Sequence, residues 1–168
     1  MRIVLVGLRG SGKTTVSDLL AERLGYECLH LDSMIESRVG NVIEEIVNRF
    51  GWEGFRAAER KVIEETSGKD SCVVDAGGGA VVEEKTCLKL ILGSIVIYLT
   101  ADLKELTRRI GDMKGRPALT DISDPMAEME KMFAERDPIY RRIASMIIDT
   151  TNKTPQETAS EILNCLQM

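Results

Sequence analysis

This sequence lacks long apolar runs and a large excess of one sign of charge, two features that would assign it to a protein class directly. A membrane-spanning helix needs about 18 consecutive apolar residues, and none of the apolar runs here approaches this length. We therefore expect no membrane association. Neither sign of charge dominates, because 22 lysines and arginines stand against 27 aspartates and glutamates, a net charge of −5. This balance argues against nonspecific binding to nucleic acid. Any anionic ligand must therefore be held by local positive charge.

Cysteine and histidine are also scarce. The four cysteines, Cys28, Cys72, Cys87 and Cys165, are too widely spaced for a CxxC redox pair or a zinc-ligand cluster. We expect them to be scattered small hydrophobic residues in a reducing cytoplasm. A strand pattern begins almost at the first residue and leaves no room for a signal peptide, which again indicates a cytoplasmic protein.

Length and composition are typical of one globular domain. At about 150 residues per domain, 168 residues predict a single domain over 1–168. Hydrophobic residues at 43% and charged residues at 29% exclude disordered and collagen-like classes. We expect a monomer.

Short apolar runs alternate with helical patterns along the chain. Strands are predicted at 3–6, 28–31, 71–75, 94–99 and 146–149. Helices are predicted from the glycine-rich segment after the first strand to Gly25, over 33–49, 52–66, 83–92, 102–110 and 125–143, and from Thr154 onward. Thr154, Pro155 and Glu157 form a capping box at the start of the last helix.

The strands are continuously apolar, which is typical of a parallel sheet covered on both faces. The fold class predicted is α/β: a three-layer α/β/α sandwich with a five-stranded parallel sheet. Residues 111–124 contain glycine, proline and charge with little apolar periodicity. We interpret them as a loop inside the domain and a candidate lid.

The segment from Gly7 to Thr14 matches the phosphate-binding pattern G-x-x-x-x-G-K-[ST] between a buried strand and a helix. Its glycines let backbone N–H groups point at phosphate oxygens, and the helix N-terminus adds positive charge. Lys13 can reach the β- and γ-phosphates, and the Thr14 hydroxyl can ligate Mg²⁺. We expect ATP and Mg²⁺ as cofactors. The residues expected to bind the nucleotide here are Gly10, Ser11, Gly12, Lys13, Thr14 and Thr15.

Two other nucleotide-binding patterns fit less well. Asp32 lies about 20 residues downstream, where a dinucleotide-binding protein has its ribose-binding acid, but Thr15 stands where the third small residue belongs. Asp75-Ala76-Gly77-Gly78 reads as the D-x-x-G of a GTPase switch. The matching guanine-binding segment, 151–154, ends in threonine rather than an acid, so nothing would recognise the guanine amine.

Six segments together resemble shikimate kinase in order and spacing, over nearly the whole chain. They are GSGKTT at 10–15, LDSMIE at 31–36, FRAAE at 55–59, GGG at 77–79, RP at 116–117 and ERDPIYRRIA at 135–144. The resemblance implies a P-loop kinase fold with a substrate-binding helical region at 33–66 and a lid at 111–124. It implies Mg²⁺-dependent transfer of the ATP γ-phosphate to the 3-hydroxyl of shikimate, in the biosynthesis of chorismate and aromatic amino acids.

The resemblance also implies which residues hold shikimate. Asp32 follows the second strand and would hold the shikimate hydroxyls, orienting or deprotonating the attacking one; it could also cap the next helix. Arg56 and Arg136 would grip the carboxylate through paired hydrogen bonds, and Glu59, three residues after Arg56, can fix its head group. The glycines expected to contact the substrate are Gly77, Gly78 and Gly79.

Three basic residues are implied on the nucleotide side. Arg116, in the candidate lid, would meet the transferring phosphoryl group and act with Lys13 and Asp32 in catalysis. Arg109 corresponds to an arginine that packs against adenine. Lys153 belongs to the loop that passes the other adenine face.

The sequence departs from the family at one pair of positions. The family commonly has D-x-D after the second strand, with the first acid supporting hydrated magnesium, but here His30 takes its place. Asp75 ends the third strand, where the family more usually has serine or threonine. We hypothesise that Asp75 takes over the outer contact to Mg²⁺.

Two alternatives stay open. A gluconate- or nucleotide-type kinase shares the scaffold, although it gives no reason for Asp32, Arg56, Gly78 and Arg136 together. A noncatalytic ATP-binding regulatory module is the second alternative, favoured only by His30.

Overall fold

The protein is described from a computed structural model that defines residues 1–111 and 124–166. Five strands form one parallel sheet in the order β2-β3-β1-β4-β5, as predicted. They are β1 (Arg2–Val6), β2 (Glu27–His30), β3 (Cys72–Asp75), β4 (Ser94–Thr100) and β5 (Met146–Asp149). The candidate lid and Arg116 lie outside the described residues, apart from the terminal positions 111 and 124.

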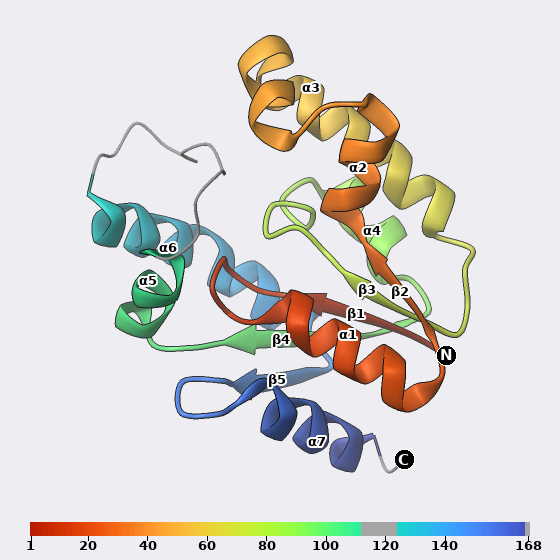
Figure 1. Cartoon of the computed structure of the whole chain (residues 1–168), viewed down its shortest axis with the longest axis vertical. Coiled ribbons are helices and arrows are strands. Elements are labelled where there is room, and N and C mark those ends of the chain that lie inside the picture. The colour runs from red at the N-terminus through yellow and green to blue at the C-terminus, as the bar shows by residue number, and fades with distance from the viewer. Residues whose placement is uncertain (112–123, 167–168) are drawn as a thin grey trace.

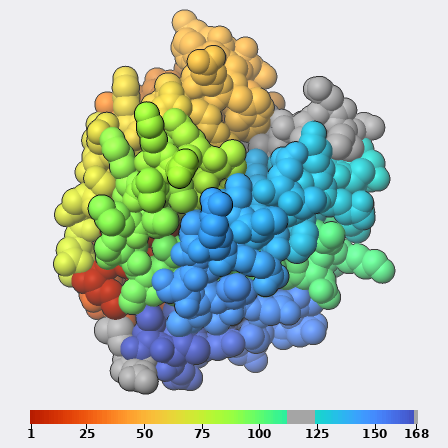
Figure 2. Space-filling model, turned by 180° about the vertical axis from the view of Figure 1, so that it is seen from behind, coloured from red at the N-terminus to blue at the C-terminus, as the bar shows by residue number. Residues whose placement is uncertain are grey.

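Helices cover both faces of the sheet and complete the three predicted layers (Figure 1). On one face, Ile3 and Leu5 of β1 pack toward α1 (Lys13–Leu24) and α7 (Pro155–Cys165). On the other, Val4 and Val6 pack in a core to which the remaining helices contribute. These are α2 (Leu31–Val39), α3 (Ile43–Thr66), α4 (Glu84–Ile91), α5 (Leu103–Gly111) and α6 (Pro125–Ile143). Figure 2 shows this second face, with α4 and α6 next to each other below α3.

The helical region after β2 differs from the prediction. The expected helix over 33–49 is wrong, because Gly40 adopts a left-handed backbone (φ 77°) that ends α2. The next helix, α3, begins at Ile43 and runs on to Thr66 through a kink at Gly51 (φ 68°, ψ 177°). Asp32 does not cap α2, since it lies within the first turn and the capping position is His30.

Two further predictions concern the start of the last helix and the burial of the cysteines. The capping box at Thr154, Pro155 and Glu157 is confirmed. Cys72 and Cys87 are buried as expected, whereas Cys28 is half-buried and Cys165 is exposed. Among the described residues, no helix combines the length and apolarity needed to cross a membrane.

The strand connections define where a ligand can bind. After β1 the chain enters α1 on one face of the sheet, and after the neighbouring β3 it enters α4 on the other face. Parallel sheets bind ligands outside the carboxyl ends of strands at such a reversal. The phosphate loop and the glycines at 77–79 follow these two strands.

Candidate active site

Two glycines of the loop between β1 and α1 stand where a side chain would not fit. Gly7 and Gly10 have positive φ angles of 150° and 78°. A Cβ at Gly7 would lie 2.3 Å from the Leu99 carbonyl oxygen, and one at Gly10 would lie 2.8 Å from that of Leu106. The first turn of α1 holds no acidic residue, and among the described residues no side chain caps this helix, so its N-terminal amides can face an anion.

Lys13 is the first residue of α1, and its ammonium group lies over this loop. Its Nζ donates hydrogen bonds to the carbonyl oxygens of Gly7 (3.0 Å) and Leu8 (3.1 Å). Ser11 is buried and Thr15 is exposed. The positive charge therefore lies at the phosphate loop, held by two of its carbonyl oxygens.

A chain of polar contacts joins the start of α1 to the ends of β2 and β3. The Thr14 hydroxyl donates to Asp75 Oδ2 at 2.6 Å. The same carboxylate oxygen lies 3.2 Å from His30 Nδ1, and His30 Nε2 lies 2.8 Å from Asp18 Oδ1. His30 and Asp75, the two positions at which the sequence departs from the family pattern, are therefore in contact with each other. Asp75 also contacts the Thr14 hydroxyl, which is expected to bind the metal.

The three glycines after β3 lie against the charged residues expected to hold the substrate. A Cβ at Gly77 would lie 3.0 Å from Asp32 Oδ1, and one at Gly78 would lie 3.2 Å from Arg136 Nη1. At Gly79 it would overlap the Arg56 guanidinium, only 1.8 Å from Nη2. The structure therefore brings together residues from α2, α3, the loop after β3 and α6.

This cluster adjoins the phosphate loop. A Cβ at Gly78 would also lie 3.2 Å from the carbonyl oxygen of Gly7. Tyr140, one turn after Arg136 on α6, donates from its hydroxyl to the carbonyl oxygen of Gly78. Burial raises the pKa of Tyr140 to about 12, so it is a neutral donor at physiological pH. The Gly7 carbonyl, which also accepts from Lys13, therefore lies where the phosphate loop meets the glycines after β3.

Glu59 is the buried partner of Arg56. Arg56 donates to Glu59 Oε2, as the spacing of three residues predicts, and the glutamate is only 2% exposed. Its other oxygen, Oε1, has no hydrogen-bond partner among the described residues. Burial raises the pKa of Glu59, and the positive charge of Arg56 offsets this only in part. The guanidinium also lies 5.2 Å from the Phe55 ring centre, which limits its orientations further.

Comparison with known sequences identifies the family of this chain. The family model for shikimate kinase matches residues 9–167. A shikimate kinase from Thermobifida fusca is 40% identical over 159 residues, covering 95% of this chain and 91% of the relative. One from Halorhodospira halophila is 39% identical over 166 residues, covering 99% and 93%. The chain belongs to the shikimate kinase family.

Solved structures agree with this assignment. The solved structure of shikimate kinase from Acinetobacter baumannii in complex with shikimate superposes with a TM-score of 0.93 at 34% identity, covering 99% of this chain and 92% of that one. The shikimate kinase from Aquifex aeolicus gives 0.85 at 30% identity, covering 99% and 96%. The P-loop kinase fold predicted from the six segments is therefore confirmed.

In this member of the shikimate kinase family, Arg109 connects separate elements of the fold. The sequence predicted only a contact with adenine for this residue. Its guanidinium donates to the Gly10 carbonyl oxygen (3.1 Å) and the Thr150 carbonyl oxygen (2.8 Å) and pairs with Glu105. It thereby ties α5 to the phosphate loop and to the loop after β5. Lys153, in that second loop, pairs with Glu161 at 2.6 Å.

The sequence motifs did not single out three polar residues of this shikimate kinase site. Tyr140 lies inside ERDPIYRRIA, and its spacing of four from Arg136 placed it on the same helix face. Asp18 lies four residues after Thr14 on α1. Thr150 offers no sequence pattern, because its contact with Arg109 depends on how α5 packs.

Proposed function

We propose that this protein transfers the γ-phosphoryl group of ATP to the 3-hydroxyl of shikimate, giving shikimate 3-phosphate and ADP. The observation that carries the proposal is the convergence of Asp32, Arg56 and Arg136 on the glycines at 77–79, next to the phosphate loop. Two guanidiniums and one carboxylate match a ligand with one carboxylate and several hydroxyls. The kinase family to which the chain belongs uses the same pair of substrates.

Each group has a role in positioning the reactants. Arg56, held by Glu59, and Arg136 would bind the shikimate carboxylate, while Asp32 accepts from its hydroxyls and orients the attacking one. Lys13 would exchange its two carbonyl partners for β- and γ-phosphate oxygens. Arg116 remains the predicted partner of the transferring phosphoryl group, outside the described residues.

The residues near Thr14 fit a magnesium ion. The Thr14 hydroxyl and the Asp75 carboxylate are 2.6 Å apart and offer the oxygen donors that Mg²⁺ prefers. When bound, Mg²⁺ would neutralise phosphate charge. We propose that Thr14 is a direct ligand and that Asp75 contacts the hydrated ion, in place of the family's acid at position 30.

The magnesium assignment predicts a change in metal dependence. Replacing Asp75 by alanine should raise the Mg²⁺ concentration that gives half-maximal turnover by about tenfold, since outer contacts typically contribute 10–100-fold. Turnover would be measured at fixed ATP over a Mg²⁺ series. An Mg²⁺ dependence equal to that of the unsubstituted enzyme would overturn the role of Asp75.

The substrate assignment is tested by ADP release in a coupled assay with shikimate, gluconate or AMP as the only acceptor. We expect release with shikimate, and its loss when Arg136 is replaced by methionine. The matched control is Arg142→Met on the same helix, an exposed arginine outside the site. Release with AMP or gluconate but not shikimate would favour another kinase, and nucleotide binding without release would favour a regulatory module.

We further propose a monomeric, cytoplasmic protein with one domain over residues 1–168 and no nucleic-acid partner. The net charge of −5 argues against nonspecific nucleic-acid binding, and a length of 168 residues is typical of one domain. Sedimentation of the purified chain tests the oligomeric state.

A further inference from the structure

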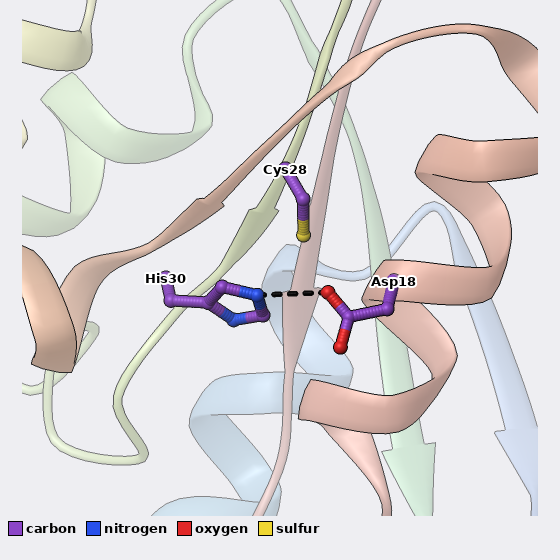
Figure 3. Close-up of side chains that lie close together, drawn as sticks. All are labelled: Asp18, Cys28 and His30. Atoms are coloured by element: carbon purple, nitrogen blue, oxygen red, sulfur yellow. Dashed lines mark hydrogen bonds and ion pairs between the residues drawn. The ribbon is translucent and has the colours of Figure 1, made fainter.

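Three metal-binding side chains from two elements meet beside the phosphate loop. Cys28 and His30 are two residues apart on β2, and the period of a strand turns both side chains to one face. Asp18 reaches them from α1, the helix that packs on this face. Their donor atoms all lie within 4.8 Å of one another. Figure 3 shows the Cys28 sulfur pointing toward the gap between His30 and Asp18.

We propose that Asp18, Cys28 and His30 form a zinc-binding site, with water completing the coordination. Thiolate, imidazole and carboxylate are the usual protein ligands of Zn²⁺. Bonds of about 2.0–2.3 Å place tetrahedral donors roughly 3.3–3.7 Å apart, and the donor pairs of the present cluster are no more than 4.8 Å apart. His30 Nε2 and Asp18 Oδ1, now 2.8 Å apart, must separate slightly. Asp18 can provide this movement because its side chain is 57% exposed.

The second nitrogen of His30 is already arranged for such a site. Its Nδ1 faces Asp75 Oδ2 at 3.2 Å, while Nε2 faces Asp18 and the Cys28 sulfur. Zinc-binding histidines commonly donate their other ring N–H to a carboxylate, which fixes the ring and strengthens the ligand. Asp75 supplies that carboxylate without being a ligand itself.

Two carboxylates favour a cation at this position. Asp75 and Asp18 lie within hydrogen-bond distance of the two different nitrogens of the His30 ring. Zinc would displace the thiol proton of Cys28 and would supply the positive charge that these carboxylates attract.

The position also couples the ion to the proposed active site. Asp75 contacts both His30 and Thr14, so a zinc ion on His30 would fix the carboxylate that the phosphate loop uses. The zinc site itself stands on its own geometry. Its test uses no ATP or shikimate, and a failure of the proposed phosphotransfer would leave it unaffected.

The site is tested with Co²⁺ and Zn²⁺ on chelator-treated full-length protein carrying Cys165→Ser, which removes the exposed thiol. We expect one Co²⁺ per chain, with the near-ultraviolet absorption of a thiolate ligand. Zn²⁺ should displace it, while excess Mg²⁺ should not, because Mg²⁺ prefers oxygen ligands. Adding Cys28→Ser should abolish the thiolate absorption and weaken Zn²⁺ binding at least about tenfold.

Two further ligand variants and one control complete the experiment. His30→Gln and Asp18→Asn should each weaken Zn²⁺ binding at least about tenfold. Glu22→Gln, an exposed carboxylate one turn further along α1, should not change it. Circular dichroism verifies that each variant is folded. If Cys28→Ser is unstable, the His30→Gln and Asp18→Asn variants still test the site. Binding without thiolate absorption, or binding that these variants leave unchanged, would overturn the proposal.

Discussion

At the scale of single residues, the site depends on the absence of side chains as much as on charged groups. Gly79 is not needed for its backbone angles, because its φ is not among the positive values. It is needed because the Arg56 guanidinium occupies the space that a Cβ would take. The head group is the flexible end of its side chain, so a methyl group here should move Arg56 rather than unfold the protein.

Gly79→Ala should therefore raise the KM for shikimate about 10–100-fold, since hydrogen bonds to charged groups contribute about 1.5–3 kcal/mol. The KM for ATP should change little, because the phosphate loop is unaffected. Steady-state kinetics with each substrate varied in turn measure both values. The control is Gly68→Ala, where a Cβ meets open space. An unchanged KM for shikimate would contradict the role of Arg56.

Glu59 makes stability depend on pH. Burial raises its pKa above the ordinary 4.5, so the folded state favours the protonated form. Its contribution to the free energy of unfolding is full below pH 4.5 and is lost as pH rises through the raised pKa. The difference in unfolding free energy between the unsubstituted protein and Glu59→Gln should then decrease from pH 4.5 toward neutrality.

Urea denaturation at a series of pH values measures this difference. Glu53→Gln, an exposed glutamate on the same helix, is the control and should show no comparable trend. A difference that stays constant, or increases with pH, would show that burial does not dominate at Glu59.

At the scale of elements, backbone turns decide where the helices place their residues. Periodicity alone predicted one helix through Gly40, but the left-handed turn there ends α2 and lets α3 begin in a new direction. Arg56 and Glu59 lie after the kink at Gly51, and the second part of α3 brings them to the glycines. The capping box at the start of α7, in contrast, involves residues three apart in sequence and was fully predictable.

Removing that cap should lower stability without altering the substrate site. The Thr154 side chain accepts from the Glu157 amide at 3.2 Å. Thr154→Ala should lower the free energy of unfolding by about 1 kcal/mol. Chemical denaturation measures the change, and Thr154→Ser, which keeps the hydroxyl, should lose much less. An equal loss in both variants would mean that the methyl group, rather than the cap, stabilises this end.

At the scale of the whole molecule, an acidic protein concentrates positive charge where two anions would meet. Lys13 stands at the phosphate loop, and Arg56 and Arg136 stand at the adjacent glycines. These groups come from three helices, so ligand binding joins distant parts of the chain. A ligand that binds only the folded state raises stability according to its concentration relative to Kd.

Shikimate at about 100 times its Kd should therefore stabilise the protein by about 2.7 kcal/mol. Thermal unfolding with and without shikimate measures the shift in Tm. The shift should vanish in Arg136→Met and persist in Arg142→Met. A Tm insensitive to shikimate in the unsubstituted protein would contradict the proposed substrate.

The sequence by itself determined what depends on short-range order: the apolar strands, the phosphate loop, the capping box and the six family segments. Local spacing also predicted the Arg56–Glu59 pair, because three residues are one helical turn. Only the tertiary structure decided which distant groups touch. Sequence spacing excluded a zinc cluster of cysteines, yet the packing of α1 on β2 places Asp18 against Cys28 and His30. The contacts of Asp75 with Thr14, and of Arg109 with Gly10 and Thr150, likewise arise where separate elements meet at the carboxyl edge of the sheet.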